Sequence, residues 1–368
     1  MIYSAEYTNL PTLDELVDNL NYALAQQPVL HLNPLERLVQ RRDCFVVTRL
    51  MSGRYSLKPN IGFSKALFIR GESYVHSTCK SVFSRNWKGR CTVENVKRNE
   101  FELLMNSHPI YQLFRDGIQL TDRFRLRMYN PYGIAMSYGF PTQLLSLTSD
   151  IKIASFFAVT KFDETEQKYK PIDNSDNTKT GILYVFNLMA PFGLISGLST
   201  VGLQPFVRPG LQKEFAINLP KDVDFKDHQF TVGFVFKHDN AISKRIFNQF
   251  HQGEALRPHN DILALRAQQI LESKEVSQAA LERNLRQNPN DNQGKIEKEL
   301  EDNDIAIVKK EHPAFTIEEL SYIYSNPTDY WMDFCKNIEF GGKDAGKLKD
   351  LLLNVPQKEE YKKYFQPH

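Results

Sequence analysis

Cysteines are few in this sequence, and their positions form no pattern that is typical of a metal site. The 368 residues include Cys44, Cys79, Cys91 and Cys335, with no C-x-x-C pair and no His/Cys cluster at metal-ligand spacing. Such cysteines are typical of reduced thiols that fill the core of an intracellular protein. We therefore expect no metal site.

Long apolar runs, a leader segment and a charge imbalance are also missing. No stretch approaches the roughly 18 apolar residues of a membrane-spanning helix. Residues 1–16 lack the basic and apolar regions of a signal peptide, so we expect a cytoplasmic protein with no membrane contact. The 46 basic and 44 acidic residues give a formal net charge of +2, which by itself favours no class of partner.

The sequence does contain a well-marked helix near its start. Residues 12–27 place apolar side chains on one helical face, begin with a capping box of Thr12 and Glu15, and stop before Pro28. The β-branched run at 44–51 predicts a strand. We therefore expect residues 1–58 to form a helix-and-strand extension in front of the main domain.

The middle of the chain, 59–265, has the pattern of a mixed α+β domain. Short apolar runs alternate with glycine, proline, asparagine and aspartate, and strands are expected at 65–71, 181–188, 214–219 and 230–237. Residues 151–162 fit a helix or a strand, and the good N-caps Ser149 and Asp150 favour the helix. The polar run 163–181 predicts a surface loop. Helices and strands do not alternate regularly, which favours the α+β class.

The last part of the chain, 266–368, is predicted to be helical and rich in charge. A second capping box, of Thr316 and Glu319, marks one helix start. The charged stretch 295–311 fits a helix or a partly extended segment. No internal repeat is present, so a repeat architecture is not expected.

Five short motifs follow one another in the middle of the chain. They are FIRGES at 68–73, KSVFSRN at 80–86, SYGFPTQLLSLTSDIKIASFFA at 137–158, RPGLQKEF at 208–215 and SKRIFNQFHQGEALRPHND at 243–261. In order and spacing they resemble the FRG-domain family, which is named for a Phe-Arg-Gly motif. Some positions depart from the family pattern: Ser137 and Ser146, where members often have His and Asp, and Leu147, where they often have Trp. The QKE of residues 212–214 is also not the commonest form.

FRG domains are similar, in motif order, to the ADP-ribosyltransferase fold, a split α+β barrel of two small sheets around an NAD cleft. The resemblance implies that Arg70 is the arginine of the first strand. It implies that Thr148 and Ser149 precede the apolar helix, and that Gln212 and Glu214 belong to a Gln/Glu-x-Glu turn. We therefore expect a split two-sheet barrel with NAD as co-substrate, and Arg70 and Glu214 as catalytic residues.

The chemistry of NAD suits these residue types. Arginine binds phosphate oxygens bidentately, and glycine lets a ligand approach the backbone. Cleavage of the nicotinamide–ribose bond develops an oxocarbenium-like cation, which a carboxylate such as that of Glu214 stabilises. The residues expected to bind NAD are Arg70, Gly71, Tyr138, Thr142, Thr148, Ser149, Arg208 and Gln212.

Each candidate also has a purely structural interpretation, which the sequence leaves open. Arg70 fits an arginine that ties strand ends together, and residues 138–142 fit a tight turn. Ser149 fits a helix cap. Glu214 fits an exposed residue at the start of a strand, and Arg208 fits a loop arginine.

Basic and aromatic residues occur together in the segment 80–90, which contains no acid. This composition suits single-stranded nucleic acid, by phosphate neutralisation and base stacking, and it also suits a solvated face with buried aromatic residues. The residues expected to contact nucleic acid are Arg85, Trp87, Lys88 and Arg90. An RNA or single-stranded DNA acceptor is slightly favoured over a protein acceptor. The resemblance also implies a toxin or phage-defence effector, with an antitoxin as partner.

Three functions are compatible with these motifs. The favoured one is an NAD-dependent ADP-ribosyltransferase that modifies a macromolecule. The second is a non-catalytic module that holds a nucleotide or phosphate with the same arginines. The third is an NAD glycohydrolase, which splits NAD without transfer.

Overall fold

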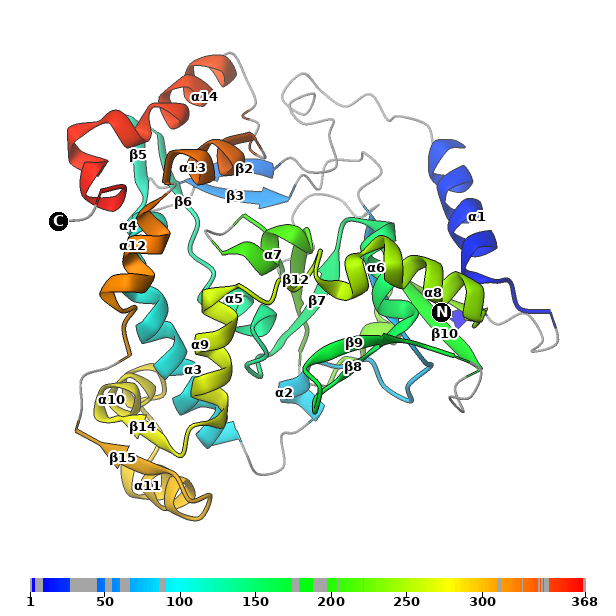
Figure 1. Cartoon of the computed structure of the whole chain (residues 1–368), viewed down its shortest axis with the longest axis horizontal. Helices are drawn as coiled ribbons and strands as arrows, with labels where there is room; N and C mark the ends of the chain where they lie inside the picture. Colours follow the sequence, from blue (N-terminus) through cyan, green and yellow to red (C-terminus); the bar gives the residue numbers. More distant parts are fainter. Residues whose placement is uncertain are drawn as a thin grey trace.

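The computed structural model describes most of the chain (Figure 1). The described residues are 2–3, 9–26, 45–49, 55–59, 67–85, 91–122, 124–173, 179–187, 197–203, 206–220, 222–309, 313–325, 327–336, 338, 340 and 344–366. Pro28, Cys44, Trp87, Lys88 and Arg90 lie outside these ranges. The expectations that rest on these five residues stay predictions.

The centre of the molecule is a seven-stranded, mainly antiparallel sheet, and the chain is a mixed helix-and-sheet protein of the α+β class. From one edge to the other the strands are β1 (Ile2–Tyr3), β13 (Thr231–Lys237), β10 (Thr180–Asn187), β4 (Leu67–Glu72), β7 (Leu144–Thr148), β12 (Glu214–Asn218) and β11 (Leu198–Thr200). Only β1 runs parallel to its neighbour, β13. The four strands expected in the middle of the chain are confirmed as β4, β10, β12 and β13.

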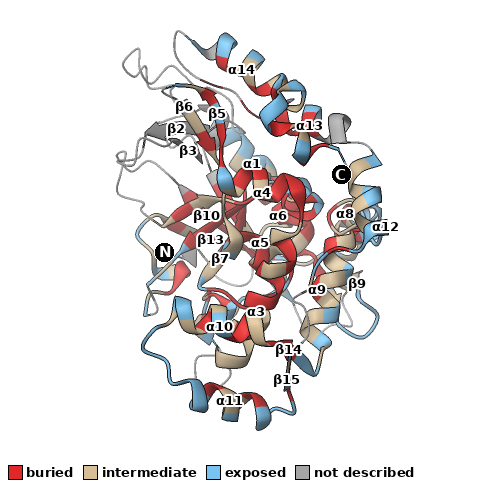
Figure 2. Ribbon diagram, turned by 90° about the vertical axis from the view of Figure 1, so that its left-hand side faces the viewer, coloured by how far each residue is buried: buried red, intermediate tan, exposed pale blue. Residues whose placement is uncertain are grey.

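Alternation along these strands produces two cores, one on each face of the sheet. On β4, Phe68 belongs to the cluster that contains Trp331, whereas Ile69 belongs to the cluster that contains Phe156. On β10, Tyr184 and Leu183 alternate in the same way. This is the period of two that places successive strand residues on opposite faces. Buried residues accordingly concentrate around β10, β13 and the helices next to them (Figure 2).

The expected N-terminal helix is confirmed as α1 (Leu13–Gln26). In its capping box the Thr12 backbone N–H donates to Glu15 Oε2 at 2.8 Å, and the Glu15 N–H donates to Thr12 Oγ1 at 3.4 Å. Its apolar residues Leu13 and Leu16 pack into the same core as Phe156. The expected strand at 44–51 is confirmed as β2 (Phe45–Arg49).

The helix expected at 151–162 is shorter than predicted, and part of the loop expected at 163–181 is a hairpin. Helix α6 (Ile151–Ala158) starts at the N-cap Asp150, whose carboxylate accepts from the Lys152 N–H at 2.9 Å. The chain then continues as β8 (Thr160–Asp163), paired with β9 (Lys168–Pro171). A β-branched pair follows Ala158, and cross-strand contacts such as Lys170 with Asp163 at 2.7 Å favour the hairpin over a longer helix.

The remaining strands form two small sheets. A four-stranded sheet has the order β2, β3 (Tyr55–Pro59), β6 (Phe124–Arg127), β5 (Ile118–Thr121). Strands β14 (Glu275–Ser277) and β15 (Ala306–Val308) form a parallel pair. The other described α-helices before residue 262 are α2 (Val82–Arg85), α3 (Cys91–Asn106), α4 (Pro109–Asp116), α5 (Pro131–Ser137), α7 (Val207–Leu211) and α8 (Asn240–Gln249).

The helical C-terminal part is confirmed. Its helices are α9 (Ile262–Glu272), α10 (Gln278–Gln287), α11 (Gln293–Glu301), α12 (Ile317–Ser325), α13 (Pro327–Lys336) and α14 (Ala345–Leu353). The second capping box forms as expected, with the Thr316 N–H donating to Glu319 Oε2 at 2.7 Å. Trp331 of α13 packs in the same core as Phe68, so this part shares its packing with the central sheet. In the described chain, no helix combines the length and the apolar character needed to cross a bilayer.

Gly71 allows strand β4 and helix α6 to approach each other closely. A Cβ atom at this position would lie 1.9 Å from the Ala154 carbonyl oxygen and 2.9 Å from the Ala158 Cβ. The first of these is a backbone atom inside a helix, so it cannot move away without shifting the helix. Gly71 therefore has a packing role, in addition to any contact with a ligand.

We expect Gly71→Ala to lower the free energy of unfolding by ~3 kcal/mol, because the added methyl group overpacks the contact between β4 and α6. Urea unfolding of the two proteins measures this difference. The control is Gly346→Ala in α14, where a Cβ meets no described atom within 4 Å. That change should raise stability by roughly 0.5–1 kcal/mol. Equal effects of the two substitutions would contradict the close approach at Gly71.

Candidate functional site

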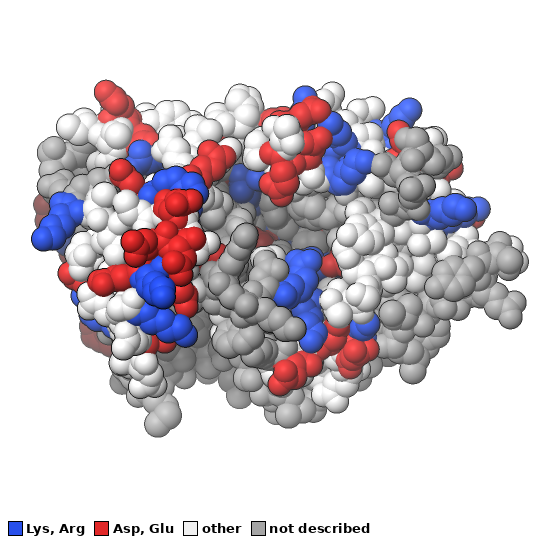
Figure 3. Space-filling model, turned by 90° about the horizontal axis from the view of Figure 1, so that it is seen from below, with Lys and Arg blue, Asp and Glu red and all other residues white. Residues whose placement is uncertain are grey.

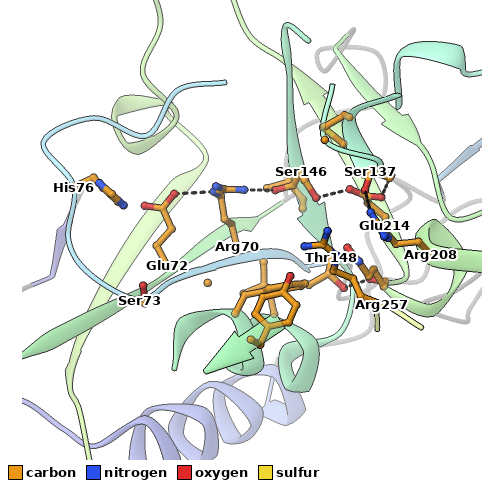
Figure 4. A pocket seen from close by; sticks show the side chains of 18 of the residues that line it. Arg70, Glu72, Ser73, His76, Ser137, Ser146, Thr148, Arg208, Glu214 and Arg257 are labelled. Atoms are coloured by element: carbon orange, nitrogen blue, oxygen red, sulfur yellow. Dashed lines mark hydrogen bonds and ion pairs between the residues drawn. The ribbon is translucent and has the colours of Figure 1, made fainter. Parts of the chain in front are cut away.

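A cavity of about 440 Å³ lies where β4, β7 and β12 meet. Strand β7 lies between the other two, and Thr148 pairs in register with Ile69 on one side and with Glu214 on the other. Between β4 and β7 this is the single residue pair, so the two strands diverge beyond it. The cavity opens at this divergence. Its polar lining includes Arg70, Ser146 and Glu214, which come from three different motifs of the sequence (Figure 4).

Arg70 connects the diverging strands. Its Nη1 donates to the Ser146 carbonyl oxygen at 3.0 Å, and its Nε forms an ion pair with Glu72 Oε1 at 2.9 Å. Burial lowers the pKa of the Arg70 guanidinium, but the charge of Glu72, with the nearby Cys79 thiol, outweighs burial and raises that pKa. The side chain is 24% exposed, so part of the guanidinium remains accessible from the cavity. Arg70 therefore does tie strand ends together, and its exposed part can still contact a ligand in the cavity.

Glu214 is a buried carboxylate that is held by two serine hydroxyl groups. Only 2% of the residue is exposed. Ser146 Oγ donates to its Oε1 at 2.6 Å, and Ser137 Oγ contacts its Oε2. The interpretation of Glu214 as an exposed residue at a strand start is wrong, because β12 lies inside the sheet between β7 and β11 and Ser137, at the end of α5, covers the carboxylate.

Burial raises the pKa of Glu214 from its usual 4.5 to about 7, although both serine hydroxyls and the charges of Arg208 and Arg70 act to lower it. The hydroxyl group of Ser137 has two acceptors within hydrogen-bond distance, the Gly133 carbonyl oxygen at 3.1 Å and Glu214 Oε2. Because a hydroxyl group has one proton, Ser137 divides it between these acceptors and offsets the burial of Glu214 only in part.

Arg208 lies on the other side of the carboxylate, in α7. Its guanidinium lies over the Tyr138 ring, 4.7 Å from the ring centroid, and its Nη1 donates to the Ser137 carbonyl oxygen at 3.2 Å. Burial, and then the charge of Arg257, lowers the pKa of Arg208. Arg208 is therefore a cavity residue rather than an exposed loop arginine.

The turn before β12 closes the same side of the cavity. Thr148 Oγ1 donates to the Gln212 carbonyl oxygen at 2.8 Å, and Gln212 Nε2 donates to the Leu256 carbonyl oxygen at 3.1 Å. These bonds fix the Gln212 side chain against the loop that carries Arg257. Thr148 therefore buttresses the strands, while both Thr148 and Gln212 also line the cavity.

The structure brings most of the predicted site residues into one cavity. Those that line it are Arg70, Gly71, Arg85, Thr148, Arg208, Gln212 and Glu214. Tyr138, Thr142 and Ser149 are not among the lining residues. Tyr138 lies under Arg208 and donates its hydroxyl proton to Asp261 Oδ2 at 2.9 Å. Thr142 Oγ1 accepts from the Leu144 N–H at 3.2 Å, which fits the tight-turn interpretation of 138–142.

Ser149 differs from its expected role as helix cap. The capping side chain of α6 is that of Asp150, while the Ser149 Oγ is buried and has no hydrogen-bond partner among the described residues. A direct contact of Ser149 with NAD stays a prediction.

Several residues that line the cavity were not predicted from the sequence, among them Ser137, Ser146, Arg257 and Tyr169. Ser137 and Ser146 stand out in the sequence only as departures from the family pattern, yet both contact the Glu214 carboxylate. The two departures were the available signal, and their common partner is seen only in the structure. Arg257 and Tyr169 also line the cavity, and nothing in their local sequence distinguishes them from other surface residues.

Comparison of the chain with protein-family models gave no match, and comparisons with curated proteins and with solved structures gave none either. The resemblance to FRG domains therefore stays a prediction. Among the described residues there is no group of three His, Cys, Asp or Glu side chains that could hold a metal ion. The polar lining of the cavity consists mainly of arginines, serines and acidic residues such as Glu214.

The pKa of Glu214 makes stability depend on pH. The folded-state value of about 7 lies above the usual 4.5, so the stabilisation present below pH 4.5 is lost as pH rises to 7. We expect Glu214→Gln to avoid this loss and to gain, relative to wild type, on the order of 3 kcal/mol between pH 4.5 and pH 8. Urea unfolding at several pH values between 5 and 8 measures the difference.

The matched control is Glu359→Gln, at a side chain that is 88% exposed. Water solvates that carboxylate in both states, so we expect a much smaller pH effect. If wild type and Glu214→Gln differ by the same amount at pH 5 and pH 8, Glu214 is not held as a buried acid.

Proposed function

We propose that the cavity binds NAD and that the protein transfers ADP-ribose from NAD to a macromolecule. The observation that carries this proposal is the shared cavity of Arg70 and Glu214, 144 positions apart by subtraction of residue numbers, which are linked through Ser146. A dinucleotide offers the two chemistries that these groups recognise, phosphate oxygens and a sugar that becomes cationic. Arg70, Gly71, Thr148, Arg208 and Gln212 are the proposed binding residues.

The arrangement of strands supports the split-barrel part of the proposal. The seven-stranded sheet divides at the single pair Ile69–Thr148 into β1, β13, β10, β4 on one side and β7, β12, β11 on the other. We propose that these are the two small sheets of an ADP-ribosyltransferase-like barrel, with NAD in the opening between them.

The proposed reaction uses Glu214 in its ionised form. The nicotinamide–ribose bond breaks, its electron pair moves onto the positively charged ring nitrogen, and neutral nicotinamide leaves. The ionised carboxylate stabilises the oxocarbenium-like ribose, and an oxygen or nitrogen of the acceptor forms the new bond. With a pKa of about 7, Glu214 is also suited to take up the proton that the acceptor releases.

For the acceptor we propose a nucleic acid ahead of a protein. Arg85, which lies in the basic segment 80–90, lines the cavity and is exposed. Figure 3 shows Lys and Arg side chains at the edge of a hollow, with acidic clusters on either side, so the surface is not uniformly basic. An RNA or single-stranded DNA would therefore contact the protein locally, next to Arg85 at the cavity. The role as a toxin or phage-defence effector with an antitoxin partner, in the cytoplasm, follows from the resemblance alone.

We expect label from NAD, carried on the ADP-ribose part, to appear on RNA, single-stranded DNA or protein when purified protein is incubated with each. Glu214→Gln and Arg70→Ala should each lower the rate ~100- to 1,000-fold, because each removes a group that stabilises charge in the cavity. Glu359→Gln is the control and should retain full activity. Release of nicotinamide without label transfer would support a glycohydrolase, and binding of NAD without turnover would support a non-catalytic module.

The pH profile tests the role of Glu214 separately. Since the ionised carboxylate acts, we expect the rate to rise with pH and to reach half its maximum near pH 7, the pKa of the carboxyl group. Ser146→Ala removes a hydrogen bond that lowers this pKa, so its half-maximum should move to higher pH. The control is Ser155→Ala, a buried serine that donates to the Ile151 carbonyl oxygen at 2.7 Å in α6. An unchanged midpoint in Ser146→Ala would exclude Glu214 as the titrating group.

A further inference from the structure

Arg208 is a buried arginine that forms no ion pair with another described residue. The residue is 6% exposed, and its Nε is buried without a hydrogen-bond partner among the described residues. Two carboxyl groups interact with its charge without forming an ion pair: Glu214, whose pKa Arg208 lowers, and Asp261, which already accepts from the Tyr138 hydroxyl at 2.9 Å and from the Leu263 N–H at 3.1 Å. A buried guanidinium with a free donor in a cavity indicates a missing anion.

Arg257 lines the same cavity as Arg208 and is half-buried. Its guanidinium lies over the Phe162 ring at 3.9 Å from the centroid and near the Tyr169 ring at 5.9 Å. Aromatic faces orient a guanidinium without cancelling its charge. The ion pairs formed within the described part of the chain include neither Arg257 nor Arg208.

The two arginines act on each other across the cavity. Both line it, and Figure 4 shows both on the same side of Arg70 as Glu214. After burial, the charge of Arg257 is the largest cause of the lowered pKa of Arg208. Aromatic rings and backbone groups hold these two cations near each other, and neither has an ion-pair partner among the described residues. They repel each other, and an anion bound between them would relieve that repulsion.

Arg70 is less suited to the same task. Its charge is shared with Glu72 at 2.9 Å, and one of its donors is occupied by the Ser146 carbonyl oxygen. Because Glu72 shares the charge of Arg70, a phosphate would bind Arg70 more weakly than an arginine that has no ion-pair partner.

We propose that Arg208 and Arg257 form the pyrophosphate subsite of the cavity, a role that rests on the proposed function and deepens it. In NAD the pyrophosphate is joined to the nicotinamide ribose through the 5′ carbon of that ribose. A subsite next to Glu214 therefore places the reactive ribose carbon on the same side of the cavity as the carboxylate. Arg70 then contacts the other end of the ligand or holds the strands.

Inorganic pyrophosphate is the probe that tests the subsite by itself. Titration calorimetry at pH 8 should show that wild type binds it and that Arg257→Ala binds it ~10- to 100-fold more weakly, the loss expected for a charge-assisted hydrogen bond. Arg257→Glu should abolish binding, because the new carboxylate would pair with Arg208. Arg257 is chosen because it is partly exposed, whereas removal of the buried Arg208 risks unfolding.

The control is Arg245→Ala. The Arg245 guanidinium pairs with Asp14 at 2.6 Å and does not line the cavity, so this variant should bind pyrophosphate as wild type does. Absence of binding to wild type, or equal binding to wild type and both Arg257 variants, overturns the subsite. Pyrophosphate binding without NAD turnover supports the subsite and counts against the transferase. NAD turnover with an unchanged KM in Arg257→Ala supports the transferase and overturns the subsite.

Discussion

The single pairing between β4 and β7, Ile69 with Thr148, is the constraint on which the cavity depends. If β4 and β7 paired over more residues, no opening would remain between the two halves of the sheet. If they did not pair at all, the two halves would have no fixed register. Because the strands meet once and diverge, Arg70 reaches across to the carbonyl of Ser146 in place of a ladder hydrogen bond. The same meeting point places Glu214 opposite Thr148 on the next strand. The close approach of α6 at Gly71 holds β4 from its other face.

Charge is distributed unevenly around this opening. At one end Arg70 forms an ion pair with Glu72 and connects β4 to β7 through the Ser146 carbonyl oxygen. At the other end a buried carboxylate lies among two serine hydroxyls, with arginines that have no ion-pair partner in the described structure. A folded protein keeps groups in such conditions at a cost to stability, since a buried carboxyl or guanidinium is more stable when it is neutral or paired. Such a cost is typical of sites that are arranged for a ligand rather than for the free fold.

Local patterns predicted most of the elements, and they failed where distant contacts decide. Capping boxes at Thr12 and Thr316 and alternating apolar runs identify helices and strands because the interactions involved span a few residues. The end of α6 and the strand β9 were missed because the pairing of Lys170 with Asp163 competes with helix formation and leaves no local signal. Ser137 and Ser146 were visible as unusual residues, but their shared partner was not, since it lies 77 and 68 positions away.

The sequence by itself determined the order of the motifs, the α+β class, and the presence of an arginine and a carboxylate suited to a phosphorylated sugar. Each of these depends on residue type and on short-range spacing, which are the same in the unfolded and the folded chain. Only the tertiary structure decided that Arg70 faces Glu72 rather than open solvent, that Glu214 is buried, and that Arg257 joins Arg208. Those outcomes follow from strand register and from the packing of α5, α7 and the loop after α8, where contacts join residues far apart in the chain. A shift of one residue in the strand register would place each strand side chain on the opposite face of the sheet.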